Sequence, residues 1–121
     1  MEARALKKSI RMSPRKMRLV IDLIRGKKAS EAITILRFNP KHAAFEAEMV
    51  LRSAIANLNQ KANSEGIRIR ENDILIKNVF VNQGYTIPRR LSGPRGMVFR
   101  IRKRTNHLTI IVGTPDEEIK V

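Results

Sequence analysis

The residues best suited to chemistry lie in one stretch near the C-terminus, from Gly84 to Arg104, which holds seven basic side chains and no acidic one. The basic residues are Arg89, Arg90, Arg95, Arg100, Arg102, Lys103 and Arg104. A guanidinium group offers a planar fork of donors that suits phosphate, and cationic side chains gain affinity for nucleic acid by displacing its counterions. The pattern therefore predicts binding to a polyanion rather than bond-making chemistry.

Side chains for catalysis or metal binding are sparse by comparison. The two histidines, His42 and His107, lie far apart in the sequence without acidic residues at metal-ligand spacing, and there is no cysteine. The stretch Gly93-Pro94-Arg95-Gly96 lacks the lysine, the hydroxyl residue and the helix that complete a phosphate-binding loop. We therefore expect no enzyme activity, no metal, no cofactor and no small-molecule substrate.

The net charge of +14 is divided unevenly along the 121 residues. Residues 1–28 carry ten basic and two acidic side chains, a net +8, and residues 74–115 carry eight basic and none acidic, again +8. Residues 29–73 carry six of each and are neutral, whereas residues 116–121 have a net charge of −2. This distribution indicates two binding surfaces on one scaffold, because a merely basic protein would spread its charge evenly.

The seven cations near the C-terminus require an element that presents them. Strand-like segments flank them, Ile74 to Val81 before and Leu108 to Val112 after, and turn-forming residues fill the middle, Ser92 to Gly96. The pattern predicts one β-hairpin with arms from Ile74 to about Arg90 and from Met97 to Val112, roughly 50 Å long at about 3.3 Å per residue. We expect an apolar root and a polar tip. A two-stranded ribbon is marginally stable alone in water, so an external polyanion must hold it.

The other basic cluster belongs to a predicted strand and helix. Arg4 to Arg11 alternate as a short strand, with Leu6 and Ile10 on one face. Ser13-Pro14 then starts a helix as its cap and first residue, and Gly26 stops it. The helix has an apolar stripe at Met17, Val20, Ile21 and Ile24, and its cations, Arg15, Lys16, Arg18 and Arg25, lie off that stripe. Cations at a helix start oppose its macrodipole, which favours nucleic-acid binding over the alternative of a merely solvated basic face.

Two further helices are predicted in the neutral middle of the chain. Ser30 caps a short helix with Ile33 and Leu36 inward, and this helix ends before Asn39-Pro40. That pair starts the longest helix, with the asparagine as its cap and the proline first. Its inward stripe is rich in small residues: Ala43, Ala47, Val50, Leu51, Ala54, Ile55, Leu58 and Ala62. We expect the first helix and the sheet to pack closely against this stripe.

These elements predict an α+β fold, with three helices packed on a small antiparallel sheet and one long β-hairpin projecting from the body. Ile67 and Ile69 would begin one further strand. The length suits a single domain, residues 1–121. Its predicted parts are a globular body at 1–82 and 104–115, an extended hairpin at about 83–103, and an acidic, frayed tail at 116–121.

Neither a membrane nor a secreted location is indicated. No apolar run approaches the length of about 18 residues that spans a bilayer, and the N-terminus lacks the apolar core of a secretion signal. The basic stretch Met1 to Met12 suits an organellar transit peptide, but the alternation of Leu6, Lys8 and Ile10 favours a strand of the mature protein. We expect no membrane partner.

The kind of nucleic acid follows from what the basic segments lack. No helix shows the exposed face of a DNA recognition helix, and aromatic residues for stacking on single strands are scarce. Tyr85 and Phe99 suit packing across the ribbon, with contact to a base as the alternative for either. A long cationic ribbon that orders on its partner fits insertion between RNA helices, which are recognised by shape. The alternatives are a DNA-bending nucleoid-type protein with a cationic β-ribbon and, less consistent with the residues, an RNA-processing enzyme.

Motifs spread over nearly the full length resemble the bacterial-type L-twenty-two family of large-subunit ribosomal proteins. They are Ser13-Pro14-Arg15-Lys16-Met17-Arg18-Leu19-Val20 with Asp22-Leu23-Ile24-Arg25-Gly26-Lys27, Ser53-Ala54-Ile55-Ala56-Asn57, Phe80-Val81 with Gly84, and Arg102-Lys103-Arg104-Thr105-Asn106-His107-Leu108-Thr109. The first and last are highly specific in combination. The resemblance implies a body of three helices on a small antiparallel sheet, in agreement with the pattern above.

In that family the hairpin runs inward from the subunit surface, between ribosomal RNA domains, to the nascent-peptide exit tunnel. The resemblance implies that the seven hairpin cations contact 23S-type ribosomal RNA. It assigns the body's RNA surface to Arg15, Lys16, Arg18, Arg25, Lys27 and Lys28, and the tunnel-facing tip to Leu91, Ser92, Gly93 and Pro94. It further implies a structural constituent that aids subunit assembly and meets neighbouring large-subunit proteins, in cytoplasmic ribosomes or alternatively in organellar ones.

The hairpin departs from the family pattern at two places. Gln83-Gly84-Tyr85 stands where the family usually has Glu-Gly-Pro. The tip, Ser92 to Met97, stands where the family usually has Pro-Arg-Ala-x-Gly-Arg. The spacing from Phe80-Val81 to Arg102 is unchanged, so we expect a hairpin of the same length. Which tip side chains face the tunnel is left open by these departures.

Overall fold

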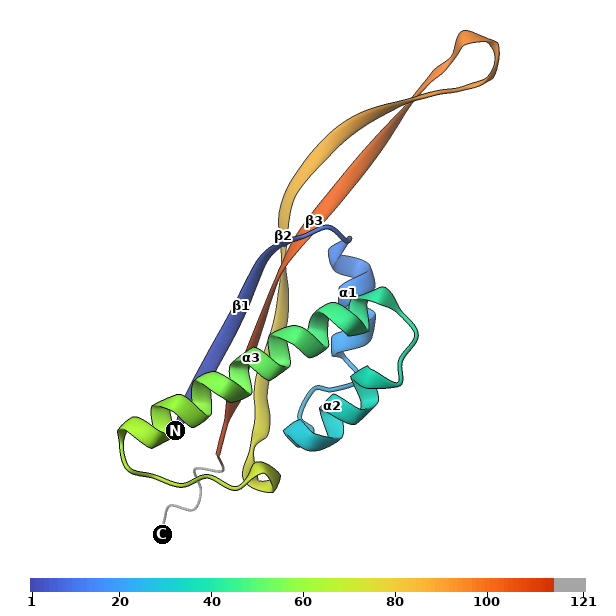
Figure 1. Cartoon of the computed structure of the whole chain (residues 1–121). Coiled ribbons are helices and arrows are strands. Elements are labelled where there is room, and N and C mark those ends of the chain that lie inside the picture. The colour runs from blue at the N-terminus through green and yellow to red at the C-terminus, as the bar shows by residue number, and fades with distance from the viewer. Residues whose placement is uncertain (115–121) are drawn as a thin grey trace.

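The computed structural model describes residues 1–114, which form three helices and a three-stranded antiparallel sheet (Figure 1). The elements are β1 (Glu2–Ile10), α1 (Pro14–Ile21), α2 (Ala29–Arg37), α3 (His42–Ser64), β2 (Leu75–Ser92) and β3 (Val98–Gly113), with 3-10 turns at Glu71–Asp73 and Pro94–Gly96. The α+β fold predicted from the sequence is confirmed. The predicted acidic tail lies outside the described residues. No helix within residues 1–114 is long and apolar enough to cross a membrane.

The sheet has the strand order β1-β3-β2, so β3 is its central strand. β1 pairs with β3 only as far as Ile10, which lies opposite Asn106. β2 pairs with β3 along nearly its full length, to Ser92 opposite Val98. The residues of β3 that precede Asn106 pair with β2 alone, so this part of the sheet has two strands. It is the projecting hairpin in Figure 1.

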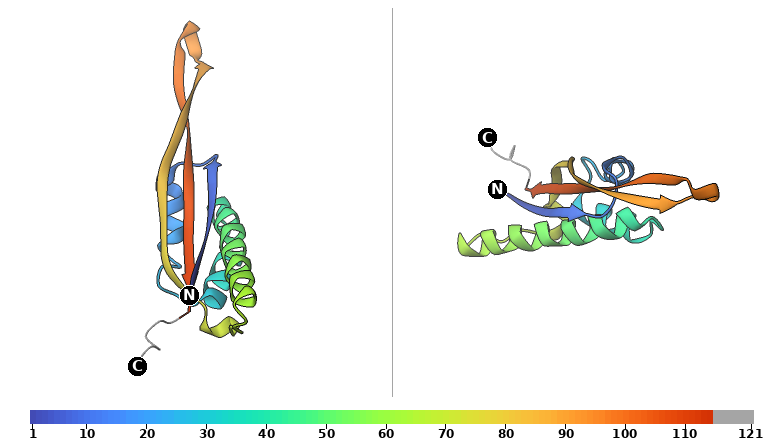
Figure 2. Two further views of the ribbon diagram at one scale, coloured as in Figure 1. Left: turned by 90° about the vertical axis from the view of Figure 1, so that its left-hand side faces the viewer. Right: turned by 90° about the horizontal axis from the view of Figure 1, so that it is seen from above.

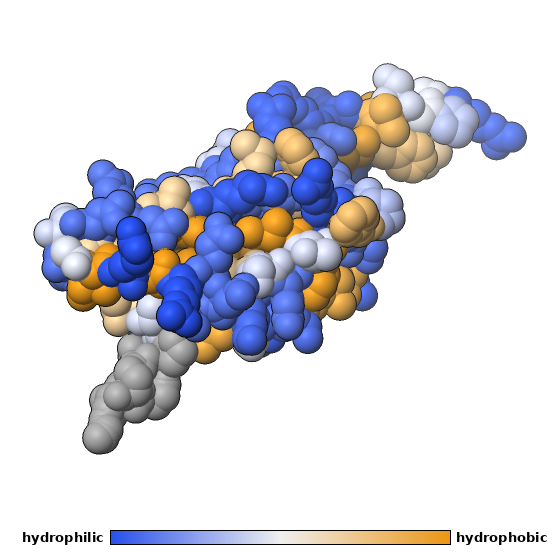
Figure 3. Space-filling view, turned by 60° about the horizontal axis from the view of Figure 1, so that its bottom comes forward, coloured by the Kyte–Doolittle hydropathy of each residue, from blue (hydrophilic) through white to orange (hydrophobic). Residues whose placement is uncertain are grey.

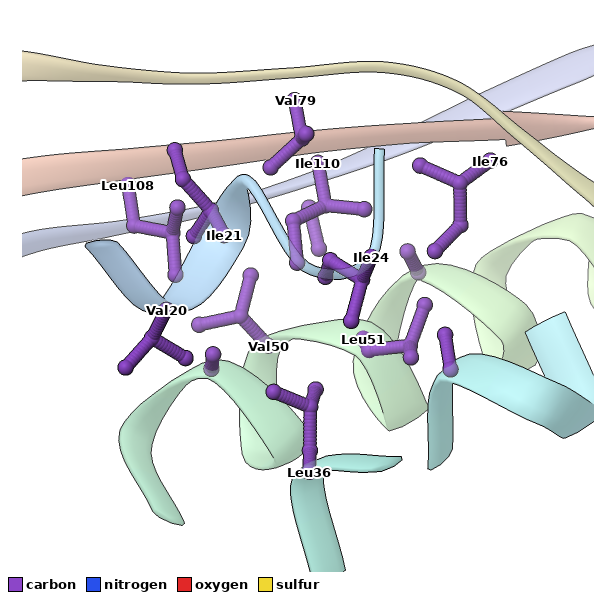
Figure 4. Packing of buried hydrophobic residues seen from close by; sticks show 14 of the residues in the cluster. Val20, Ile21, Ile24, Leu36, Val50, Leu51, Ile76, Val79, Leu108 and Ile110 are labelled. Carbon is purple, nitrogen blue, oxygen red and sulfur yellow. The ribbon is translucent and has the colours of Figure 1, made fainter. Parts of the chain in front are cut away.

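The helices pack on one face of the sheet, and in the left view of Figure 2 α1 lies behind β2 while α3 runs alongside β1. The predicted apolar stripe of the first helix is completely buried in the core between these layers, as are most of the predicted inward residues of α3. Alternate residues of the strands, among them Val79, Leu108 and Ile110, meet them from the sheet (Figure 4). Each such aliphatic side chain contributes about 1.5–3 kcal/mol by leaving water.

The start of α1 is as predicted and its end is not. The Lys16 N–H donates to the Ser13 hydroxyl oxygen at 3.3 Å, and Pro14 is the first helical residue. The regular helix ends at Ile21, and the chain continues in tighter turns to Gly26, whose φ of 75° favours glycine. In these turns the Ile24 N–H donates to the Ile21 carbonyl at 3.1 Å, and Ile24 remains buried with the rest of the stripe.

The starts of α2 and α3 differ from the prediction, and neither helix has a side-chain cap. Ser30 does not cap α2: the N–H of Ala29 donates to the Ile74 carbonyl at 2.9 Å, so the helix begins earlier without a side-chain cap. Asn39 does not cap α3 either. Its Oδ1 accepts from the Lys41 N–H at 3.0 Å in a turn that precedes the helix.

Two strand predictions are wrong. Leu6 does not share a face with Ile10, because a bulge at Ser9, with φ of 58°, shifts the alternation of β1. Ala5 and Ile10 are buried instead, and Leu6 lies exposed on the uncovered face of the sheet. The segment from Ile67 to Ile69 forms no strand; it is an irregular connection that leads into a 3-10 turn.

A second bulge, in β2, marks the base of the hairpin. The pairing register skips between Gln83 and Thr86, so Gly84 and Tyr85 together oppose Thr105. The Thr105 hydroxyl donates to the Tyr85 carbonyl at 2.7 Å. Gly84 lies so close to Thr105 that an added Cβ would overlap its Oγ1. A bulge increases the local twist, so this contact sets the direction in which the hairpin leaves the body.

Candidate nucleic-acid interface

The pairing register of the hairpin divides its cations between two faces. Residues directly opposite each other on antiparallel strands share a face, as do alternate residues along one strand. Arg90 lies opposite Arg100, and Arg102 and Arg104 follow on the same face of β3. Like charges directly opposite each other destabilise a strand pair, so a bound anion would stabilise this face by reducing the repulsion.

The other face of the ribbon carries cations spaced by apolar side chains. Arg89 lies opposite Ile101, and Lys103 lies opposite Ile87. Both isoleucines are half-buried, whereas both cations are exposed. Residues 74–115 contain no acidic residue, and none of the seven hairpin cations forms an ion pair within residues 1–114. A ribbon that is cationic on both faces suits a position between two anionic surfaces.

The hairpin turns back through Gly93 to Met97. The Gly93 N–H donates to the Met97 carbonyl at 2.6 Å, and Arg95 and Gly96 adopt φ of 58° and 74°. This turn places Arg95 at the far end of the hairpin. There it is exposed and remote from the predicted RNA-binding cations of the body. The arginine pays a small conformational cost for its positive φ, since that region favours glycine.

An apolar collar, which comprises Leu91, Met97, Val98 and Phe99, surrounds the hairpin next to this turn, and each of its side chains is 46–61% exposed. Figure 3 shows apolar side chains between the hydrophilic base of the hairpin and its hydrophilic end. The predicted polar tip is therefore limited to the turn itself, and the apolar collar next to it was not predicted. Among the predicted tunnel-facing residues, Leu91, Ser92 and Pro94 are exposed, whereas Gly93 is half-buried under the Phe99 ring.

Two of the predicted RNA-binding cations of the body have partners within the protein. An Arg18 guanidinium N–H donates to the Val81 carbonyl at 3.2 Å, and one from Arg25 donates to the Val79 carbonyl at 2.8 Å. Arg25 also lies 3.3 Å from the Asp22 carboxylate. β2 is an edge strand, so these two side chains of the first helical segment satisfy acceptors on its outer edge.

The other predicted cations of the body are exposed and lie before Arg18 and after Arg25 along the chain. Arg15 and Lys16 lie in the first turn of α1, near the point where the hairpin leaves the body, and no acidic side chain stands in that turn (Figure 1). Lys27 and Lys28 follow α1 and lie beside the start of β2, where the Lys27 carbonyl accepts from the Ile76 N–H at 3.0 Å. Arg18 beside Val81, Arg25 beside Val79 and Lys27 beside Ile76 follow one another along the edge strand β2.

One cation that the sequence analysis did not single out lies between the body and hairpin groups. Arg11 directly follows β1 and lines a basal notch of about 300 Å³ together with Ile87, Arg89, Lys103, Arg104 and Thr105. The only sequence signal for Arg11 is its place between a predicted strand and a helix cap, within the basic first 28 residues. The residues that join it are more than 70 positions away along the chain.

The two histidines make local contacts. The Nδ1 atom of His107 accepts from the Ser9 N–H at 3.0 Å. The Nε2 atom of His42 lies 3.8 Å from the Glu46 carboxylate, which also pairs with Lys7. Within the described part of the chain, no group of three or more histidine, cysteine, aspartate or glutamate side chains could hold a metal ion. The side chains that the fold brings together in number are cations.

The sequence matches known proteins across both the body and the hairpin. Residues 5–113 match the family described as Ribosomal protein L22p/L17e. The chain is 47% identical over 116 residues to the large ribosomal subunit protein uL22 of Bifidobacterium longum (strain DJO10A), with 96% of this chain and 98% of the relative covered. It is also 47% identical over 114 residues to uL22 of Chlorobium phaeobacteroides (strain BS1), with 94% and 96% covered.

Proposed function

Because the chain belongs to the ribosomal protein L22p/L17e family, we propose that it is a structural constituent of the large ribosomal subunit that binds ribosomal RNA and aids subunit assembly. The observation that carries this function is the register of the hairpin. It places cations on both faces of a ribbon that contains no acidic residue. Such a ribbon is stabilised when RNA lies against each face and supplies the missing negative charge.

The proposed RNA contacts divide into three groups. The hairpin contributes Arg89, Arg90, Arg95, Arg100, Arg102, Lys103 and Arg104, the start of α1 contributes Arg15 and Lys16, and the turn before α2 contributes Lys27 and Lys28. Arg18 and Arg25 contribute only the guanidinium donors that the β2 carbonyls leave free. A DNA-bending protein would need a similar cationic ribbon, but the match to ribosomal proteins over residues 5–113 favours RNA.

Neighbouring large-subunit proteins are the second proposed class of partner. The outer side of α3 belongs to the neutral part of the sequence, residues 29–73. It exposes Phe45 and Met49, with 59% and 50% of their surfaces open. Apolar side chains in a neutral setting suit a protein partner better than a phosphate backbone. In a bacterial cell these partners place the protein in the cytoplasm, within the ribosome.

The tip of the hairpin is proposed to approach the nascent peptide in the exit tunnel. Leu91, Ser92 and Pro94 are exposed at the far end of the ribbon, and the apolar collar extends this surface. A photo-crosslinking residue in place of Leu91 should attach to nascent chains in translating ribosomes, whereas the same residue in place of Ser30 should not. Attachment from both positions, or from neither, would remove the tip from the list of peptide contacts.

Sedimentation of a cell extract through a high-salt sucrose gradient tests the main proposal. Electrostatic binding to nucleic acid falls steeply with salt, whereas a hairpin enclosed by RNA is held by many contacts at once. We expect the protein to stay with the large subunit after the salt wash. Release into the free fractions, or recovery with chromosomal DNA, would instead indicate loose binding by charge or the DNA-bending alternative.

A further inference from the structure

The strongest unassigned site in the molecule is the basal notch, lined by Arg11, Ile87, Arg89, Lys103, Arg104 and Thr105. We propose that the basal notch binds one sugar–phosphate unit of ribosomal RNA, with Arg11 and Arg89 holding the same phosphate. The inference rests on the proposed function and deepens it, because it identifies where the RNA backbone is held and adds Arg11 to the residues that hold it.

The notch lies where the sheet changes from three strands to two. β1 ends at Ile10 opposite Asn106, so the β3 residues that precede Asn106 have no β1 strand beside them. Arg11 is the first residue after this end. Arg89 and Lys103 come from β2 and β3, on the face of the hairpin that also carries Ile87. Three segments of the chain thus direct cations toward one concave space rather than along a flat surface.

The position of Arg11 is fixed on both sides by hydrogen bonds. Before it, the Ser9 N–H donates to the Nδ1 atom of His107 at 3.0 Å. After it, the Met12 carbonyl accepts from the Nδ2 atom of Asn106 at 2.8 Å. Both anchors connect the end of β1 to β3 at the base of the hairpin. The Arg11 backbone is therefore held in place before any ligand arrives, which lowers the entropic cost of binding.

The chemistry of the lining selects a sugar–phosphate unit. Four of the six lining residues are cations, of which Arg104 belongs to the opposite face of the ribbon, and none is acidic, so the notch attracts an anion. A volume of about 300 Å³ has room for roughly ten water molecules at about 30 Å³ each, which is more than a phosphate group alone fills. Ile87 supplies an apolar surface for the ribose. The buried Thr105 hydroxyl already donates to the Tyr85 carbonyl and keeps the floor rigid.

A double-mutant cycle in the full-length protein tests whether Arg11 and Arg89 hold the same phosphate. The probe is the transcribed large-subunit ribosomal RNA, and the measurement is its dissociation constant at one fixed salt concentration. We expect Arg11→Ala and Arg89→Ala each to weaken binding by about tenfold. The double variant should weaken it by roughly thirtyfold rather than a hundredfold, because contacts to one shared group are not additive.

Two controls make the result specific. The pair Arg11→Ala and Arg100→Ala should multiply to about a hundredfold, because Arg100 lies on the other face of the ribbon. Arg37→Ala, on the exposed end of α2, should leave the affinity unchanged. Arg11→Lys keeps the charge without the planar fork and should bind more tightly than Arg11→Ala but less tightly than the natural protein. Thermal unfolding should confirm that every variant is folded.

The outcomes separate this inference from the proposed function. An affinity of Arg11→Ala equal to that of Arg37→Ala would show that the notch does not contact the RNA. Multiplicative losses in the Arg11 and Arg89 pair would show two independent phosphates, and either result would overturn the shared site while leaving ribosomal RNA binding intact. If the natural protein bound this RNA no better than an unrelated RNA of equal length, the proposed function itself would fail.

Discussion

In the body, side chains of the helices donate hydrogen bonds to backbone carbonyls at both edges of the sheet. In the hairpin, β2 and β3 continue with no helix beside them. Asn57 and Lys61 of α3 donate to carbonyls of β1, each at 3.0 Å, and Arg18 and Arg25 do the same for β2. These contacts close the edges and leave the body complete in itself.

The hairpin, by contrast, places like charges opposite each other and exposes apolar side chains. Arg90 and Arg100 stand directly opposite each other, and the apolar collar at its end is exposed on every member. Neither feature stabilises an isolated ribbon. Arg18 and Arg25 each have an acceptor within the protein and are structural, whereas we propose that the hairpin arginines, which form no ion pair within residues 1–114, bind RNA.

Removal of the distal hairpin, residues Ile87 to Val98, should give the largest difference between the two regions, with a large loss of RNA affinity and little loss of stability. The deletion takes away three cations and no member of the buried core. We expect the affinity for ribosomal RNA to fall roughly a thousandfold, at about 1.5 kcal/mol or more per charged contact. The thermal midpoint of the isolated protein should move by less than about 3 °C. A large loss of thermal stability would show that the hairpin belongs to the folding unit of the body.

Substitution of two isoleucines of β3 compares the stability contributions of the body and the hairpin without a deletion. Ile110 is fully buried in the body, whereas Ile101 is half-buried in the hairpin. Ile110→Ala should lower the free energy of unfolding by about 2–5 kcal/mol, because it leaves a cavity in the core. Ile101→Ala should lower it by less than about 1 kcal/mol. Urea unfolding of the two variants measures both values, and equal losses would end the distinction between body and hairpin.

Much of this division could be predicted from local pattern. The buried stripe from Met17 to Ile24 follows from helical spacing, and the long hairpin follows from strand-like segments on either side of a turn-rich stretch. Both predictions depend on residues close together in the sequence. The core of the hairpin root could likewise be predicted, because Leu108, Ile110 and Val112 alternate as a half-buried strand must.

The errors arose where distant segments decide the outcome. The bulge at Ser9 reverses the face of Leu6, and the Ile74 carbonyl replaces Ser30 as the partner of the first α2 donor. The basal notch depends on the β1–β3 register, which no local pattern reports, so Arg11 was not identified. The structural role of Arg18 was missed for the same reason, since its acceptor lies 63 residues away.

Arg18 and Arg15 provide a third comparison, within α1 itself. Arg18 donates to the Val81 carbonyl, and Arg15 is exposed near the helix start. Arg18→Ala should destabilise the isolated protein by about 1 kcal/mol, a value reduced from that of a buried charged hydrogen bond because the side chain is partly in water. Arg15→Ala should leave stability unchanged or raise it slightly, because it removes a cation from a helix start. Thermal unfolding at low salt measures the difference, and the reverse order would mean that Arg18 is held by RNA alone.

The smallest expected effect is also the most direct test of how the hairpin is stabilised. Arg100→Glu places a carboxylate opposite Arg90 and replaces a like-charge pair with an attractive one. The isolated ribbon should gain about 0.5 kcal/mol, visible as slower amide hydrogen exchange around Arg100. Its affinity for ribosomal RNA should fall, because the face that Arg90 and Arg100 share then loses two units of positive charge. A hairpin that gained order and affinity together would mean that its sequence serves its own folding. The opposite signs that we expect mean that the arginines are selected for the partner and that the free ribbon bears the cost.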